Sequence, residues 1–230
     1  MTDEQRERFS RHLILPEMGE EGQERLLASR VLVIGVGGLG SPISLYLTAA
    51  GVGCLGLADH DVVTLSNLQR QVLHGDANVG QPKVESAREK LMRINHDLRL
   101  QCHQQRVTDE NVEELISQYD FVVEATDNVA SRYRVNDACV HLGKPYVMGG
   151  VSHYGGQVMT WMPGCTTYRD IFPDGEDRHQ PLPVFSPLVG MLGTIMAAEV
   201  VKCVAGVGKP LTNRLLVFDA LTMNFNTLNI

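Results

Sequence analysis

The sequence lacks the marks of several protein classes. It contains no C-x-x-C pair, and its five cysteines lie far apart along the chain. An odd number of scattered cysteines predicts free thiols and gives no sign of a structural zinc site. The first residues, MTDEQRERFSRHL, are charged and include no apolar segment of the kind found in secretory signals. We therefore expect a cytoplasmic protein with reduced cysteines.

Two further absences limit the partners. The most apolar late stretch, PLVGMLGTIMAAEVVKCVAG, is interrupted by Glu199 and Lys202, so it predicts a buried helix and no membrane span. The formal charge of −7 argues against a nucleic-acid duplex as the main partner, because binding to a phosphate backbone favours a basic surface. We expect neither a membrane nor a nucleic-acid partner.

Strand-like and helix-like segments alternate along most of the chain. A length of 230 residues with 43% hydrophobic content predicts one globular domain over 1–230. We expect a polar helical arm over 1–29, a long connection without periodicity over 163–183, and a Gly-Gly hinge associated with the strands 145–151 and 157–162. Expected strands cover 30–36, 54–59, 99–107, 120–126, 145–151, 157–162 and an antiparallel pair in 215–230; expected helices cover 41–51, 81–95, 109–118, 128–143 and 187–205.

This order predicts an α/β fold. A Rossmann-like, doubly wound, largely parallel sheet should carry helices on both faces and end in an antiparallel extension. Ligands of such sheets bind beyond the carboxyl ends of the strands. The residues that follow each strand are therefore the first places to look for a functional site.

The first strand ends in a glycine cluster. The stretch VLVIGVGGLGSP contains a G-x-G-x-x-G pattern between a strand and a helix, which is typical of a phosphate site. A plain strand-to-helix turn is the alternative interpretation. The glycines concerned are Gly35, Gly37, Gly38 and Gly40.

The second strand ends at Asp59, about 20 residues after the glycines, where a carboxylate that accepts ribose hydroxyls is expected. Asp61 could fill the same role, although we favour Asp59. Such a carboxylate serves NAD and ATP equally well. A solvated surface carboxylate is the simpler alternative.

The following stretch, TLSNLQRQ, favours a triphosphate. It carries Asn67, Arg70 and Gln71, and a planar guanidinium can hold two phosphate oxygens at once. Nicotinamide binding has no need for such a segment. A solvated loop would explain the same residues without a ligand.

Lys83 follows Pro82, a residue suited to the first helical position, so the lysine lies in the first turn of its helix. A cation there opposes the helix dipole at a cost of about 0.3–1 kcal/mol. Phosphate binding would explain that placement. The alternative is an exposed lysine that reaches into water.

The fourth strand is followed by Asp127 and Asn128. Mg²⁺ is commonly held by one or two carboxylates together with substrate phosphates, so Asp127 is a candidate magnesium ligand. A helix N-cap is its structural alternative. Together the strand ends offer a glycine loop, a ribose carboxylate, two cations and a metal carboxylate, which fits Mg-ATP better than NAD.

These motifs resemble the ubiquitin-activating-type (E1-like) adenylyltransferases of bacteria, the MoeB, ThiF and HesA family. The resemblance spans nearly the whole chain and is nearest to MoeB. It rests on RFSRHLILPEMGEEGQERL, GVGGLGSP, ADHDVVTLSNLQRQVLH, VGQPKVESAREKLMRIN, ATDN, PLVGMLGTIMAAEVVK and FDALTMNF. The combination of SNLQRQ, QPKV and ATDN is highly specific.

The resemblance implies a homodimer that binds Mg-ATP and adenylates the C-terminal glycine carboxylate of a small ubiquitin-fold sulfur carrier, MoaD-like or ThiS-like. Pyrophosphate would be released, and the pathway would be molybdopterin or thiamine biosynthesis. The resemblance also implies residue roles. Asp59 would bind the ribose, and the phosphates would be contacted by Asn67, Arg70 and Lys83, supported by Gln71. Asp127 would be linked to magnesium and position the carboxylate, and Arg11 would contact the phosphates from the partner subunit.

The sequence departs from that family at two places. Relatives usually carry two zinc-binding C-x-x-C pairs, whereas the first is replaced here by Thr167 and Asp170, and the chain ends at Ile230 before a second. ThiF-like members also place a cysteine before the P-L-V-G helix, but RHQPLPVFSPLVG has none. We therefore expect neither zinc nor a covalent step at that place, and Cys165 is a poor substitute.

Three alternatives stay open at this point. The altered connection could receive another peptide or small carboxylate, as in E1-like enzymes of peptide natural-product biosynthesis. An NAD(P) oxidoreductase and a scaffold without turnover are less favoured, because the polar set expected for ATP is intact.

Overall fold

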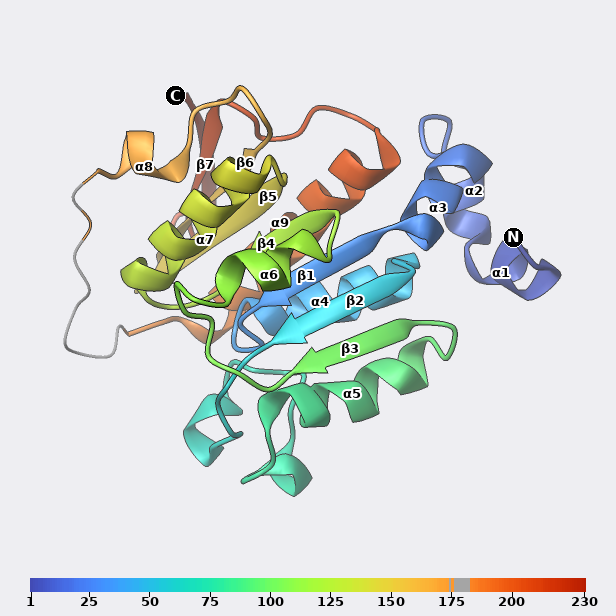
Figure 1. The fold of residues 1–230 in the computed structure, drawn as a ribbon, viewed down its shortest axis with the longest axis horizontal. Coiled ribbons are helices and arrows are strands. Elements are labelled where there is room, and N and C mark those ends of the chain that lie inside the picture. Colours follow the sequence, from blue (N-terminus) through green and yellow to red (C-terminus); the bar gives the residue numbers. More distant parts are fainter. Residues whose placement is uncertain (174, 176–182) are drawn as a thin grey trace.

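The computed structural model describes residues 1–173, 175 and 183–230. Within this part of the chain, one eight-stranded sheet has the order β3-β2-β1-β4-β5-β6-β7-β8 (Figure 1). The first five strands run parallel and the last three antiparallel, which confirms the predicted fold class. The strands are β1 (Arg30–Ile34), β2 (Cys54–Ala58), β3 (Arg99–His103), β4 (Phe121–Glu124), β5 (Tyr146–Ser152), β6 (Gly155–Trp161), β7 (Arg214–Asp219) and β8 (Asn224–Asn229).

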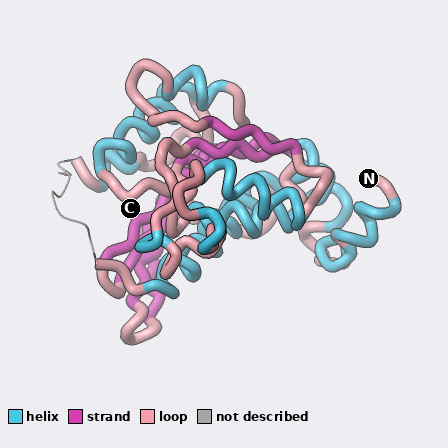
Figure 2. Tube along the Cα trace, turned by 90° about the horizontal axis from the view of Figure 1, so that it is seen from below, coloured by secondary structure: helices cyan, strands magenta, loops and turns pink. Residues whose placement is uncertain are grey.

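Helices cover both faces of the sheet. One face carries α4 (Gly40–Ala50), α5 (Lys83–Ile94) and α9 (Ser186–Ala205), and the other carries α6 (Val112–Ser117) and α7 (Val129–Leu142). The arm of α1 (Asp3–Arg8), α2 (Ser10–Leu13) and α3 (Gly19–Ala28) lies beside the start of β1 (Figure 1) and projects at the N-terminal end of the molecule (Figure 2). Short elements complete the chain: η1 (Leu65–Asn67), η2 (Asp76–Asn78) and α8 (Tyr168–Ile171).

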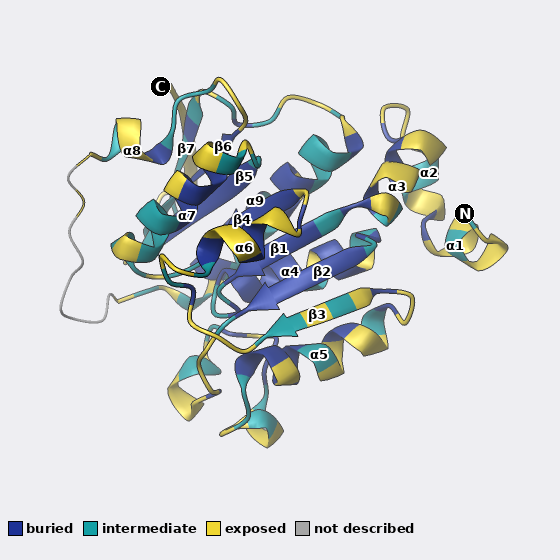
Figure 3. Cartoon of the chain, viewed as in Figure 1, coloured by how far each residue is buried: buried dark blue, intermediate teal, exposed yellow. Residues whose placement is uncertain are grey.

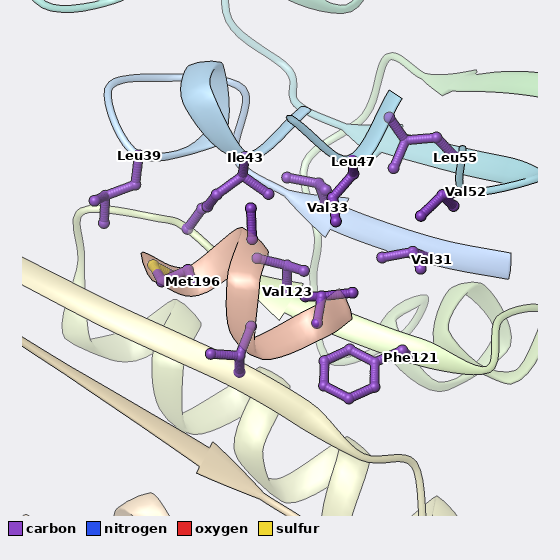
Figure 4. Close-up of a cluster of buried hydrophobic side chains, with 14 of the residues drawn as sticks. Val31, Val33, Leu39, Ile43, Leu47, Val52, Leu55, Phe121, Val123 and Met196 are labelled. Atoms are coloured by element: carbon purple, nitrogen blue, oxygen red, sulfur yellow. The ribbon is translucent and has the colours of Figure 1, made fainter. Parts of the chain in front are cut away.

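The central strands are buried on both faces, as expected for a parallel sheet. Val31 and Val33 of β1 point toward α4 and α9, whereas Leu32 and Ile34 point toward α6 and α7. Figure 4 shows the first of these clusters, in which Val123 of β4 joins the valines of β1. Each fully buried aliphatic side chain contributes about 1.5–3 kcal/mol to stability. This packing fixes the strand ends on which the candidate site is built.

By length and composition α9 is apolar enough to cross a membrane, yet half of its most apolar window is buried inside the fold. It packs against α4, β5 and β6. Its Glu199 is buried and accepts hydrogen bonds from Leu211 N at 2.6 Å and Thr160 Oγ1 at 2.7 Å. The helix is therefore a core element of this domain (Figure 3).

Some expected details are wrong. The expected Gly-Gly hinge is absent, because Gly149–Gly150 of β5 and Gly155–Gly156 of β6 are all paired between these two strands. The turn that joins the strands lies at His153, whose φ is +56°. Pro82 is the N-cap of α5 and not its first helical residue. The connection expected over 163–183 contains α8, and residues 174 and 176–182 of it lie outside the described residues.

Candidate active site

The glycine loop turns sharply between β1 and α4. Gly35 has a φ of +95°, and a Cβ on it would lie 2.7 Å from the carbonyl oxygen of Ala125, so no other residue fits there without strain. α4 begins at Gly40 without a side-chain cap from the described residues. Uncapped N–H groups at a helix N-terminus form a favourable place for an anion.

Asp59 holds this loop in place. Its Oδ2 accepts a hydrogen bond from Val36 N, and its Oδ1 accepts one from Asp61 N, each at 2.8 Å. The carboxylate thus ties the glycine loop to the end of β2. Each carboxylate oxygen can accept more than one hydrogen bond, so the predicted ribose contact stays compatible with this geometry.

The 61–83 segment forms a closed loop beside the glycines. Backbone hydrogen bonds from Val63 N to Gln81 O (2.9 Å) and from Lys83 N to Asp61 O (3.0 Å) join its two ends. Within the loop, the side chain of Asn67 caps η1 by accepting Thr64 N at 3.2 Å. The ordered base of this loop keeps its polar side chains close to the sheet edge.

Arg70 and Gln71 lie in the same loop. Arg70 donates one hydrogen bond, from Nη1 to Ser66 O at 3.1 Å, and the guanidinium carries four further donors. Gln71 is buried, and a Cβ on Gly37 would lie 3.4 Å from its amide nitrogen. Its Oε1 has no hydrogen-bond partner among the described residues. A buried amide left partly unsatisfied against a glycine loop is expected where a polar ligand binds.

Lys83 is buried, with 6% of its surface exposed, so the alternative of a lysine that reaches into water is wrong. Its Nζ lies 2.9 Å from Asp61 Oδ2. Burial alone would raise the pKa of Asp61, but the hydrogen bond and the charge of Lys83 outweigh it and the pKa lies below its usual range. This ion pair offsets the unfavourable helix dipole at the first residue of α5.

His74 belongs to the same assembly but was not predicted from the sequence. Its Nε2 lies 3.0 Å from Val36 O and its Nδ1 lies 2.8 Å from Ser86 Oγ, so it links the glycine loop to α5. Burial lowers the pKa of His74 and favours the neutral ring. The neutral ring donates from Nε2 to the carbonyl and accepts at Nδ1 from the hydroxyl.

The end of β4 carries Asp127 and Asn128. The N-cap of α7 is Asn128, whose Oδ1 accepts Ser131 N at 2.8 Å, so the alternative role of Asp127 as that cap is wrong. Asp127 is exposed at the carboxyl edge of the sheet. Glu124, three residues earlier and fully buried, was also missed from the sequence.

The structure does not bring Arg11 to this edge. Arg11 is exposed on α2, at the opposite end of the sheet from the glycine loop (Figure 1). Its predicted contact from a partner subunit is compatible with that position. Within one chain, the loop after β1, the 61–83 segment and the end of β4 converge without it.

Known proteins resemble this chain in sequence and in fold. The ThiF family model matches residues 9–230. The probable adenylyltransferase/sulfurtransferase MoeZ of Mycobacterium tuberculosis is 44% identical over all of this chain and 61% of its own length. A sulfur carrier protein adenylyltransferase of Thermus thermophilus is 42% identical, with 100% of this chain and 89% of that protein covered.

Other matches agree on the fold. The adenylyltransferase and sulfurtransferase MOCS3 of Bos taurus is 42% identical over all of this chain and 52% of its own length, so this chain spans only part of several relatives. The crystal structure of PaaA superposes with a TM-score of 0.88 at 24% identity and covers all of this chain and 75% of PaaA. The crystal structure of E. coli MccB superposes with a TM-score of 0.88 at 22% identity and covers 97% of this chain and 71% of the MccB chain. By its sequence, the chain belongs to the ThiF family.

Proposed function

We propose that residues 1–230 form a single E1-like adenylation domain that uses ATP to activate the C-terminal glycine carboxylate of a small ubiquitin-like sulfur carrier protein, MoaD-like or ThiS-like. The products are an acyl-adenylate and pyrophosphate. The observation that carries this proposal is the closed 61–83 segment, which holds Gln71 against the glycine loop and Lys83 close by. The relatives from Thermus thermophilus and Mycobacterium tuberculosis, a sulfur carrier protein adenylyltransferase and a probable adenylyltransferase/sulfurtransferase, support the same reaction class.

The chemistry requires two anions to approach each other. In this proposal the glycine loop and the N-terminus of α4 bind the nucleotide phosphates, and Asp59 accepts a ribose hydroxyl. Asn67, Arg70 and Lys83 contact the phosphates, and Gln71 supports them. Bound cations lower the repulsion between carboxylate and triphosphate and stabilise the charge that develops on pyrophosphate. The substrate carboxylate itself attacks the α-phosphorus, so no protein nucleophile is needed.

Asp127 is proposed to hold Mg²⁺ together with the phosphates and to position the attacking carboxylate. Its exposed carboxylate at the sheet edge fits a hard cation that prefers oxygen ligands. The metal would supply Lewis-acid stabilisation of phosphate charge. Asn128 is proposed to line the same edge, although its side chain already caps α7.

The working unit is proposed to be a homodimer in which Arg11 reaches the phosphates of the partner. Two groups of exposed apolar side chains support this assembly. Ile14 and Leu15 follow Arg11 at one end of the chain's sheet, and Leu65 and Val72 lie in the 61–83 segment. In a two-fold dimer, the Ile14–Leu15 patch of each subunit can pack against the Leu65–Val72 patch of its partner. The contact would bring Arg11 toward the partner's candidate site.

Zinc is proposed to play no part. Thr167 and Asp170 stand where a first cysteine pair is expected, and they bond to each other as a capping box that starts α8. Asp170 Oδ2 accepts Thr167 N at 2.8 Å and Thr167 Oγ1 at 2.7 Å. These oxygens are occupied within the turn and offer no thiolate. The residues present do not fit a tetrahedral thiolate site.

ATP–pyrophosphate exchange tests the proposed function. Purified protein is assayed with a panel of small carrier proteins that end in Gly-Gly and with the same carriers lacking the last glycine. Exchange with the full carriers alone supports the proposal. Exchange with unrelated peptides or small carboxylates would favour the second acceptor class, and ATP binding without any exchange would favour a scaffold and overturn the proposal.

A further inference from the structure

Thr126, the residue before Asp127, is held from two sides by side chains to which the proposed adenylation reaction assigns no role. Glu124 Oε1 accepts Thr126 N at 2.9 Å and also accepts the Thr126 hydroxyl. Arg132 Nη2 donates to Thr126 O at 3.4 Å. The backbone N–H and the hydroxyl of Thr126 thus donate to the Glu124 carboxylate, and the carbonyl of Thr126 accepts from the Arg132 guanidinium.

The anion and cation face each other inside the protein. Glu124 is fully buried at the end of β4, and its Oε2 lies 3.7 Å from Arg132 Nε. Neither atom has a hydrogen-bond partner among the described residues. Burying a charged pair costs free energy unless geometry and hydrogen bonds offset it, so the pair is poorly explained by stability alone.

The neighbouring strand leaves room for this guanidinium. Gly150 of β5 is buried, and a Cβ on it would lie 3.0 Å from Arg132 Nη1 and 3.1 Å from Nη2. Arg132 therefore rests directly over the backbone at Gly150, at the carboxyl edge where the candidate site is built. The sheet itself limits where the guanidinium can move.

We propose that Glu124 and Arg132 are positioning residues, which clamp Thr126 so that the carboxylate of Asp127 is held in the geometry needed for adenylation. The inference rests on the proposed function of Asp127. The clamp acts through the backbone of one residue, and neither clamp side chain touches ATP. Loosening it should reduce the chemical step more than nucleotide affinity, because the glycine loop, Arg70 and Lys83 are untouched.

Burial raises the pKa of Glu124 to about 7, and the Arg132 charge and the Thr126 hydrogen bonds oppose that rise. The cation therefore favours the ionised carboxylate that accepts both Thr126 donors. Loss of the cation would favour a protonated Glu124, whose neutral carboxyl is a weaker acceptor for the two Thr126 donors at Oε1. The two members of the clamp depend on each other.

Three variants test the clamp from different sides. Glu124→Gln removes the anion, Arg132→Lys shortens and reshapes the cation, and Gly150→Ala displaces the guanidinium without removing a charge. The matched control is Glu199→Gln, which neutralises another buried carboxylate that bonds Thr160 and Leu211 far from Asp127. Each variant is assayed for ATP–pyrophosphate exchange with carrier, ATP affinity by calorimetry, and melting temperature.

We expect kcat for exchange to fall roughly ten-fold or more in the clamp variants, as is typical when a supporting shell is disturbed. The Kd for ATP should change less than about two-fold, which is the signature of a lost transition-state interaction. The melting temperature of the control, Glu199→Gln, should fall while its kcat stays near that of the wild-type protein. Unchanged kcat in Arg132→Lys and Gly150→Ala, or a loss of kcat that follows melting temperature in all four variants, would overturn the proposal.

A second readout is independent of turnover. Hydrogen exchange of the peptide that contains residues 124–128 should show a protected Thr126 amide in the wild-type protein and faster exchange in Arg132→Lys. Equal exchange in both would refute the clamp even if the wild-type protein adenylates a carrier. If the Thr126 amide is protected from hydrogen exchange in the wild-type protein but that protein shows no ATP–pyrophosphate exchange, only the proposed function is refuted.

Discussion

The Nζ atom of Lys83 lies 2.9 Å from Oδ2 of Asp61, and this ion pair joins the first residue of α5 to the segment after β2. The backbone repeats the link, because Lys83 N donates to Asp61 O at 3.0 Å. A buried cation is thereby held at the edge of the glycine loop. The pair explains how α5 tolerates a positive charge at its N-terminus.

Replacement of Lys83 by alanine should weaken ATP binding. A charge-assisted hydrogen bond contributes about 1.5–3 kcal/mol, so the Kd measured by calorimetry should rise roughly ten- to hundred-fold. Arg88→Ala is the matched control, since Arg88 lies on the same helix and pairs with Glu85 at the surface. Equal affinities of the two variants for ATP would show that Lys83 serves only the fold.

Subunit complementation tests the proposed position of Arg11. Arg11→Ala and Asp127→Ala should each abolish exchange, because each removes one side of every site. If Arg11 acts across the dimer, co-expressed variants form mixed dimers with one intact site, and about one quarter of wild-type activity should return. Activity that stays at the level of the single variants would place Arg11 outside the partner's site or deny the dimer.

The stability of the fold should respond to the protonation of His74. Because burial places its folded-state pKa below the ordinary value of 6.5, the neutral ring contributes stability above about pH 6.5 that is lost as the pH falls toward the folded-state pKa. Melting temperatures of the wild-type protein and of His74→Gln are compared between about pH 5 and pH 8. The difference curve isolates His74 from Glu124, whose raised pKa acts in the opposite direction. Parallel curves would contradict the proposed role of the neutral imidazole.

Metal content gives a simple test of the altered turn at Thr167 and Asp170. Their oxygens are already engaged in the capping box of α8, so purified protein should contain well under one zinc ion per chain. Elemental analysis after gel filtration measures this. Stoichiometric zinc that resists a chelator would contradict the proposal and require a ligand set elsewhere.

Local patterns were enough to predict most of the fold. The short apolar runs of β1 and β4, and Gly143 and Gly206 at the ends of α7 and α9, define elements through contacts within a few residues. The glycine loop was predicted from the spacing of its glycines, and Lys83 from its position after Pro82 in the first turn of a helix. The shortened β3 and the Pro82 cap show the usual uncertainty of element ends.

Partners that are distant in sequence could not be predicted in this way. His74 forms a hydrogen bond with Val36 across the candidate site, and both carboxylate oxygens of Asp59 accept hydrogen bonds from backbone N–H groups. No spacing rule reveals these contacts. Glu124 reads as one polar residue in an apolar strand until Arg132 of the next helix is seen beside it. Such side chains matter through three-dimensional contacts, so only the structure places them in the site.

The most direct test of the account follows the phosphate label of ATP onto the carrier. The protein is incubated with a carrier ending in Gly-Gly and with ATP labelled at either the α- or the γ-phosphate, and carrier-bound label is measured after rapid acid quenching. We predict that only the α-label reaches the carrier and that hydroxylamine releases it as AMP. Label from the γ-phosphate on the carrier, or none from either position while ATP is bound, would contradict it.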